Sequence, residues 1–257
     1  MTVTFLGTGT STGVPLLACD CAVCRSTDPH DKRTRPAITV HGPEGTILVD
    51  AGPDLRTQCL THHIRRVDAC ILTHTHADHL FGLDDLRQFN FQYGIRTPVY
   101  GFPDSLERVR TVYDYCFKST QEGGGKPQLD LVELVPFEPF MLCGIEVLPL
   151  WHWHGELRVA SLVFNRTFAY VTDVSALPDE SRPFLQNLDT LVLGTVRYEP
   201  HPTHFHLEKA LIEAKASNAQ QTYFTHLSHH FSHAGVSETL PTNIALAYDG
   251  LRLEFSD

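Results

Sequence analysis

The sequence predicts an α/β protein in which two β-sheets pack together and helices cover their outer faces. Short apolar runs rich in Val, Ile, Leu and Phe recur along the chain, bounded by Gly, Pro, Asp or Asn, as is typical of strands. Fewer stretches show helical spacing, and they are interspersed among the strands. The 257 residues, 42% of them hydrophobic, suffice for the buried core of one domain, which we expect to span residues 1–257.

The expected strands are rich in β-branched and aromatic residues. They cover residues 3–6, 37–41, 46–49, 69–73, 99–101, 145–150, 159–164, 168–171, 191–193, 222–225 and 251–255.

Four helices are expected between these strands. Residues 53–62 begin with a proline at a plausible first helical position, and residues 104–117 place apolar side chains at helical spacing. Residues 205–216 form a third candidate, and a fourth begins near Asp78 and runs through Leu83 to Phe89. The glycines at 123–125 indicate a flexible loop, which is a candidate arm for contact with a second copy in a homodimer.

The charge balance argues against a protein that coats nucleic acid. Twenty basic residues face thirty acidic ones, and the formal net charge is −10. Nucleic-acid-binding proteins normally carry a basic face, although bound metal ions could still attract a small anionic substrate. The first residues lack the pattern of a signal peptide, and no apolar run approaches the ~20 residues that span a membrane. We therefore expect a soluble, cytoplasmic protein without a membrane partner.

The segment His74-Thr75-His76-Ala77-Asp78-His79 carries the strongest chemical signal. His74 follows an apolar strand, and His76 lies two residues on, so an extended backbone directs both side chains to one side. Asp78 and His79 follow after a turn. Imidazole and carboxylate together suit zinc, manganese or iron, whereas a surface loop that merely happens to be rich in histidine is the weaker alternative.

The density of donors in this segment favours two ions over one. A single ion needs about four ligands, and the chain holds further clustered histidines. Two ions ~3.5–4 Å apart can generate a hydroxide nucleophile and bind a substrate oxyanion. The residues therefore predict a hydrolase with a dinuclear metal centre.

This segment resembles the His-x-His-x-Asp-His motif of the metallo-β-lactamase superfamily, and the likeness extends over nearly the whole chain. The chain looks closest to the PhnP-type phosphodiesterases and more distantly like the tRNA 3′-processing endonucleases. The resemblance implies a four-layer αββα sandwich. Besides the motif, it rests on Phe5–Gly9, Cys19–Cys24, Leu48–Gly52, Thr172–Asp173, His201–His204 and Thr225–His229.

The resemblance also implies the ligands of two divalent ions, manganese or zinc. His154 matches the family position better than its neighbour His152. Asp78 is both a ligand and a residue required for catalysis, and Asp50 matches an acid that supports the ligating imidazoles. The implied set is His74, His76 and His154 on one ion, Asp78, His79 and His226 on the other, and Asp173 as the bridge between them.

Three cysteines, Cys19, Cys21 and Cys24, lie within six residues. In a cytosolic chain such a cluster favours metal binding over disulfides, and three unrelated free thiols are the alternative. PhnP-type phosphodiesterases and the pyrroloquinoline-quinone biosynthesis B proteins carry a similar cluster. The resemblance to the former implies His229 as the fourth ligand of a structural zinc ion.

His204 is the candidate general acid. Cleavage of a phosphate ester expels an alkoxide that needs a proton, and His204 matches the catalytic histidine of the PhnP-type family. His206 departs from the family pattern, since some relatives carry an acidic residue there. The sequence does not assign roles to His152, His201, His206 or His233.

The function expected is hydrolysis of a small phosphodiester, for example a cyclic ribose or nucleoside phosphate. A tRNA 3′-end endonuclease is an alternative, but the long basic arm rich in Gly and Pro that clamps tRNA in that family has no counterpart here. Hydrolysis of a lactam or a thioester, which would use the same metal ions, is another alternative. A non-catalytic, metal-binding accessory protein of a biosynthetic route is the alternative outside enzymes.

Overall fold

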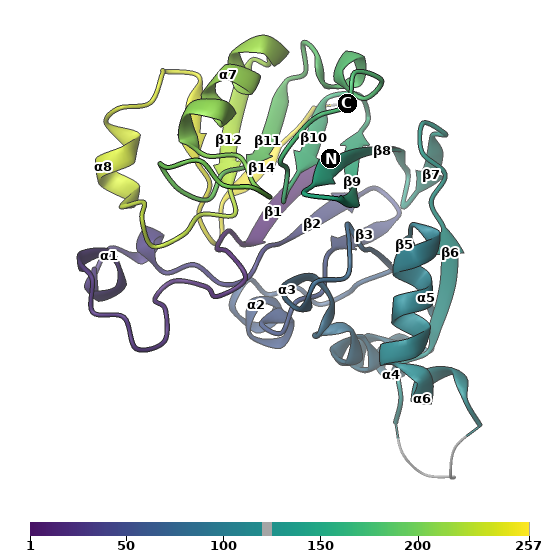
Figure 1. Cartoon of the computed structure of the whole chain (residues 1–257). Helices are drawn as coiled ribbons and strands as arrows, with labels where there is room; N and C mark the ends of the chain where they lie inside the picture. Colours follow the sequence, from purple (N-terminus) through teal and green to yellow (C-terminus); the bar gives the residue numbers. More distant parts are fainter. Residues whose placement is uncertain (120–124, 257) are drawn as a thin grey trace.

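A computed structural model describes residues 1–119 and 125–256 (Figure 1). Its two large sheets lie face to face, and helices cover the outer side of each. Among the described residues, no helix combines the length and the apolar character needed to cross a bilayer.

The first sheet is built mainly from the N-terminal half of the chain. Strands β14, β1, β2 and β3 pair antiparallel, and β3, β4, β5 and β6 pair parallel. In sheet order the described strands are β14 (Arg252–Glu254), β1 (Thr2–Gly7), β2 (Ala37–Gly42), β3 (Gly45–Val49), β4 (Ala69–Ile71), β5 (Thr97–Gly101) and β6 (Leu129–Glu133).

The second sheet has the same mixed character. Strands β7 to β10 pair antiparallel, and β10, β11, β12 and β13 pair parallel. In sheet order the described strands are β13 (Ile244–Leu246), β12 (Gln221–Thr225), β11 (Thr190–Gly194), β10 (Phe168–Val171), β9 (Leu157–Phe164), β8 (Ile145–His154) and β7 (Phe140–Leu142).

Helices of the first half pack on the first sheet, and helices of the second half pack on the second. Those of the first half are α2 (Leu55–Thr61), α3 (Ala77–Leu80), the 3₁₀ turn Leu83–Leu86, α4 (Arg87–Tyr93), α5 (Pro103–Val112) and α6 (Asp114–Phe117). The second sheet carries α7 (Leu207–Ser217) and α8 (His233–Ser237). The short helix α1 (Ala22–Arg25) and the 3₁₀ turns Pro29–Asp31 and Arg182–Leu185 lie in connecting segments.

The cores explain why four layers form. One apolar cluster lies between the sheets and joins Val3 and Phe5 of β1 to Leu162 and Phe164 of β9, all fully buried. A second cluster joins the first sheet to α2 and α5, and a third joins the second sheet to α7. A strand buried on both faces must be apolar throughout, as the fully buried β10 is. The αββα sandwich predicted from the sequence is therefore confirmed.

Each strand predicted from the sequence is present, with ends that shift by a few residues. Sequence analysis missed β6, β7 and β13. Strand β7 and strand β13 are three residues long, and each lies at the edge of its sheet, as β6 does. Short edge strands carry little hydrophobic periodicity, which is why their sequences gave no clear signal.

Two helix predictions were wrong in their extent. Residues 104–117 form two helices, α5 and α6, with the break at Tyr113. The helix expected from Asp78 to Phe89 is α3, a 3₁₀ turn and the start of α4, interrupted at Gly82. A Cβ at Gly82 would lie 2.0 Å from the carbonyl oxygen of Gly52, so only glycine permits this approach. Of the loop glycines 123–125, the first two lie outside the described residues.

Candidate metal centre

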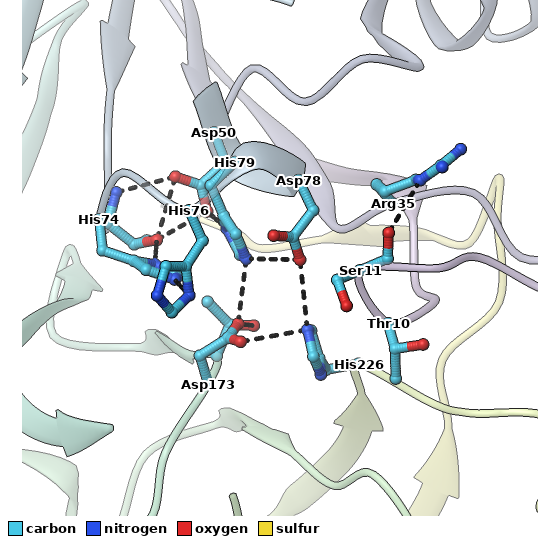
Figure 2. Close-up of polar contacts among 12 residues, drawn as sticks. Thr10, Ser11, Arg35, Asp50, His74, His76, Asp78, His79, Asp173 and His226 are labelled. Atoms are coloured by element: carbon cyan, nitrogen blue, oxygen red, sulfur yellow. Dashed lines mark hydrogen bonds and ion pairs between the residues drawn. The ribbon is translucent and has the colours of Figure 1, made fainter. Parts of the chain in front are cut away.

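The histidines and aspartates predicted as ligands come together where strands of both sheets end (Figure 2). His74 follows β4, and Asp78 and His79 lie on α3 directly after it. The remaining side chains come from the second sheet: His154 ends β8, Asp173 follows β10 and His226 follows β12. In open α/β sheets the carboxyl ends of parallel strands are the usual place for a ligand site.

Three residues at this edge have left-handed backbone conformations. The φ angles are 64° at Asp50, 52° at Asp173 and 59° at His226. Such a conformation costs roughly 1–3 kcal/mol for a residue with a side chain and persists where the surrounding structure enforces it, which is often at functional sites. In each case the sharp turn follows a strand closely; it directs the side chains of Asp173 and His226 into the centre and that of Asp50 against the back of His79.

Helix α3 is fixed against the loop after β3. The Ala51 amide donates to the carbonyl of His79 at 2.8 Å, and the Gly82 amide donates to the carbonyl of Ala51 at 2.7 Å. A Cβ at Gly52 would lie 2.0 Å from the carbonyl oxygen of Asp78. This close approach explains why Ala and Gly follow Asp50, and it places Asp78 and His79.

One donor group consists of His74, His76 and His154, whose ligand atoms lie within 4.8 Å of one another. His74 Nε2 lies 3.0 Å from His76 Nδ1. The His154 ring centroid is 5.1 Å from that of His76. His74 and His154 are buried, and His76 is exposed at the edge of the centre.

A second donor group consists of Asp78, His79 and His226, again within 4.8 Å and all buried. His79 Nε2 lies 3.3 Å from Asp78 Oδ2. His226 Nε2 lies 3.7 Å from the same oxygen.

The Asp173 carboxylate lies between the two groups. Its oxygens are 3.2 Å from His79 Nε2 and 3.1 Å from His226 Nε2. Asp173 also shares donor groups with His74 and with His154, so it borders both sets.

Contacts behind the ligands orient the imidazoles. Asp50, fully buried, has Oδ2 2.7 Å from His79 Nδ1 and accepts a hydrogen bond from the Thr73 amide at 2.8 Å. His154 Nδ1 donates to the carbonyl oxygen of Thr203 at 2.6 Å. These contacts occupy the Nδ1 atoms and leave the Nε2 atoms of His79 and His154 for the centre, as metal-ligating histidines require.

The residues at this centre fit divalent metal ions. His79 Nε2 and both ring nitrogens of His226 are buried without a hydrogen-bond partner among the described residues. Unpaired polar atoms of this kind are costly in a protein interior unless a ligand satisfies them. A set of imidazole and carboxylate donors is one that zinc and manganese accept.

The electrostatics of the centre also favour metal binding. Burial raises the pKa of the Asp78 and Asp173 carboxyls, but neighbouring histidines, His226 and His79, outweigh it and hold both pKa values below the usual range. Burial lowers the pKa of His74, whereas at His79 the carboxylates of Asp50 and Asp173 outweigh burial and raise the pKa, so a metal ion there would replace a proton. Ionised carboxylates and neutral imidazoles are the protonation states in which these groups ligate a metal.

His204 lies beside both donor groups, and together with His154 and Asp173 it forms a further set of possible ligands within 4.8 Å of one another. Its ring stacks on that of His226 with centroids 5.0 Å apart and lies 4.4 Å from that of His154. Its Nδ1 is 3.8 Å from Asp173 Oδ1. Burial, and then the neighbouring His226, lowers the pKa of His204 to about 3 in the absence of substrate.

Cys19, Cys21, Cys24 and His229 form a separate donor group. The three thiol sulfurs lie 3.3, 3.5 and 3.7 Å from His229 Nδ1, in chain order. The backbone amide of Cys24 caps the Cys21 thiol and lowers its pKa to about 6, whereas burial raises that of Cys24 to about 11. Three thiols and one imidazole suit a tetrahedral zinc ion.

The histidines whose roles the sequence left open lie outside these donor groups in the described chain. His152 is fully buried, with Nδ1 2.6 Å from Ser161 Oγ, and His201 Nδ1 accepts from the Thr203 amide at 3.2 Å. His206 precedes α7, and the His233 ring lies tilted against that of His30 with centroids 4.5 Å apart.

Sequence analysis missed two residues that shape the site. The Thr203 carbonyl orients His154, and a backbone atom leaves no signal in a sequence. Arg33 is fully buried and donates to the carbonyls of Ser228 at 2.9 Å and Phe231 at 2.8 Å, on either side of His229. Arg33 Nη2 lies 3.0 Å from Asp31 Oδ1. The two opposite charges, two residues apart in the sequence, were the feature that could have indicated a buried ion pair.

Comparison with known proteins identifies the family. Residues 45–227 match the Beta-lactamase superfamily domain. The chain belongs to the metallo-β-lactamase superfamily. It is 37% identical over 249 residues to an octanoyltransferase of Porphyromonas gingivalis, a match that covers 96% of this chain and 50% of that protein. The chain spans about half the length of the curated relatives it matches.

Solved structures point to one branch of this superfamily. A diphosphatase from the PhnP family has a TM-score of 0.92 and 41% sequence identity, with 99% of this chain and 96% of that chain covered. Zinc-bound PqqB from Methylobacterium extorquens has a TM-score of 0.79 and 19% identity, with 99% and 100% covered, and shows the shared fold. This chain is thus a metallo-β-lactamase superfamily domain related to PhnP, and its fold implies divalent metal ions.

Proposed function

We propose that this metallo-β-lactamase protein hydrolyses a small phosphodiester, for example a cyclic ribose or nucleoside phosphate. The observation that carries the proposal is the position of Asp173 between two donor groups, with His204 stacked beside them. The likeness to the PhnP-family diphosphatase supports a phosphoryl substrate.

The donor groups would hold two manganese or zinc ions, one by His74, His76 and His154 and the other by Asp78, His79 and His226. Asp173 would bridge them. When bound, such ions supply Lewis-acid charge for a phosphoryl group and lower the pKa of water. The Cys19, Cys21, Cys24 and His229 group would hold a structural zinc ion.

The chain's own residues position and protonate the substrate. Asp50 and the Thr203 carbonyl keep the ligating nitrogens directed at the centre. His204 borders the centre on the side of His154 and His226, where it can donate a proton to the leaving oxygen. An anionic phosphoryl group beside His204 would favour its protonated form and raise its pKa from the value in the substrate-free site.

Hydrolysis of bis(p-nitrophenyl) phosphate tests the proposal. Metal-stripped protein is assayed alone and after addition of Mn²⁺ or Zn²⁺, with Asp173→Asn as the control that retains the fold. We expect turnover that requires metal and falls to the blank rate in the control. A rate equal to the blank with every metal would refute the proposal and favour a non-catalytic accessory role.

Cleavage of a diphosphate bond is a second candidate, favoured by the activity named for the 41% identical PhnP-family structure. The same centre could stabilise either phosphoryl transfer, because both reactions place negative charge on equatorial oxygens. Release of phosphate from a nucleoside diphosphate, measured beside the phosphodiesterase rate, distinguishes the two.

The alternative of a tRNA 3′-end endonuclease is disfavoured by the formal net charge of −10, since tRNA binding rests on contacts from basic side chains to phosphates. The cytoplasmic location and the homodimer predicted from the sequence stay predictions.

A further inference from the structure

A cavity of about 560 Å³ adjoins the metal centre at His74 and Thr75. Its other walls come from the start of α5, the end of β6 and the hairpin between β8 and β9. The volume falls within the range of ~300–1,000 Å³ that is usual for small-molecule sites. Because His74 belongs both to the cavity wall and to a metal-donor group, a substrate held at the centre can extend into this space.

Aromatic side chains form one wall of the cavity. Phe102, Trp151 and Trp153 line it, and the two indole rings meet edge to face with centroids 5.0 Å apart. The Arg158 guanidinium carbon lies 4.3 Å from the centroid of Trp151, so this wall already binds one cation. An aromatic face attracts positive charge through its quadrupole, most strongly for tryptophan.

Carboxylates form another part of the lining. Asp104, Glu133 and Glu156 are exposed, and none of them makes an ion pair with a described residue. Besides His74, Arg158 is the one basic side chain among the described lining residues, and it already lies over Trp151. The cavity therefore presents three carboxylates against one guanidinium. A lining of one predominant sign concentrates ligands of the opposite sign.

We propose that this cavity binds the organic group esterified to the phosphodiester and selects a group that carries positive charge, such as an alkylammonium alcohol. The proposal rests on the proposed function, because it assumes that the phosphoryl group lies at the metal centre. The tryptophan wall would contact the ammonium group, and Glu133 and Glu156 would supply the opposing charge. The same lining would repel a substrate with a second anionic group.

Two chromogenic phosphodiesters separate this inference from the activity itself. p-Nitrophenyl phosphocholine carries the ammonium group, and ethyl p-nitrophenyl phosphate lacks it. We expect kcat/KM about tenfold higher for the choline ester, a size typical of a cation held by aromatic and carboxylate groups. The double variant Glu133→Gln/Glu156→Gln should bring the ratio of the two kcat/KM values close to one and leave the ethyl ester unchanged.

Glu238→Gln is the matched control, since Glu238 is exposed at the end of α8 and outside the cavity lining. It should leave both rates unchanged. Trp153→Leu is a second test of the aromatic wall. It should raise KM for the choline ester and leave kcat for the ethyl ester unchanged. The inference would be overturned, and the proposed function would stand, if the ratio of the two kcat/KM values were near one in the wild type. A double variant that kept the wild-type ratio would have the same consequence. Wild-type protein that cleaves neither ester would overturn the proposed function and the inference with it.

Discussion

The two metal-donor clusters of this protein are built in different ways. The histidine and aspartate donors come from the ends of β4, β8, β10 and β12, and therefore from both sheets. The cysteine donors come from one short segment around α1, and His229 alone comes from elsewhere. The first cluster is thus placed by the packing of the whole sandwich, and the second by a local turn and one distant residue.

Burial separates the clusters further. His79 is 0% exposed and Asp173 2%, whereas Cys19 and Cys21 are half-buried. Asp50, through its contact of 2.7 Å, holds His79 from behind. Around the thiols the structure offers mainly backbone amides and the imidazole of His229. The first cluster is therefore held in place before a metal binds, whereas the second depends on its ion for rigidity.

The clusters are joined through one loop. His226 and His229 are three residues apart, and Arg33 holds this loop by hydrogen bonds to the carbonyls of Ser228 and Phe231. A zinc ion on His229 would therefore stabilise the segment that follows His226. Because Arg33 is a second, metal-independent attachment, loss of that zinc ion should affect stability more than chemistry.

The largest expected effect comes from removing a donor of the preorganised cluster. Asp78→Ala should lower kcat by roughly a thousandfold or more, because the ion it holds would supply several kcal/mol of transition-state stabilisation. Steady-state phosphodiesterase kinetics with saturating metal measure this effect. Full activity with unchanged metal content would show that Asp78 is not a ligand.

His204→Ala should give the next largest loss. Removing a general acid typically costs about 10²–10⁴-fold, and the metals should stay bound because each proposed ion keeps its three donors and the Asp173 bridge. Kinetics on a phosphodiester with an alkoxide leaving group, together with metal analysis of the purified variant, test both parts. His206→Ala, two residues along and outside the donor groups, is the control and should retain its activity. An unchanged rate in His204→Ala would remove His204 from the mechanism.

Asp50→Asn tests whether preorganisation matters. The amide cannot hold His79 as the carboxylate does, and loss of such a contact usually costs roughly 10–100-fold in metal affinity. Zinc titration of the metal-stripped variant by competition with a chelating dye measures the shift. Asp130→Asn, which alters an exposed ion pair with Arg96, should bind zinc like the wild type. Equal affinity in both variants would contradict the idea that Asp50 prepares the site.

Cys21→Ser should have the smallest effect on catalysis. We expect a lower Tm by several degrees, since a 257-residue protein loses about 2–4 °C per kcal/mol, and a kcat within about threefold of the wild type. Thermal unfolding with and without a zinc chelator measures the change in Tm. Cys116→Ser on α6 is the control, and its unfolding should not change with the chelator. A loss of activity as large as that of Asp78→Ala would show that the two clusters are not independent.

The difference between the two metal-donor clusters also explains which site residues the sequence could predict. His74–His79 were recognisable because one strand and one turn bring four donor residues together, and Cys19, Cys21 and Cys24 are equally local. His154, Asp173 and His226 lie far along the chain, and only the family resemblance indicated them. The Thr203 carbonyl, the buried Arg33 and the tryptophan-lined cavity arise from tertiary packing, which no local pattern records.

The most direct test of the account is a count of bound ions by native mass spectrometry. Metal-stripped protein is loaded with excess Zn²⁺ and desalted before measurement, beside Cys21→Ser treated in the same way. We expect three ions in the wild type, two at the paired centre and one at the cysteine site, and two in the variant. Two or fewer ions in the wild type, or the same count in both proteins, would contradict this expectation.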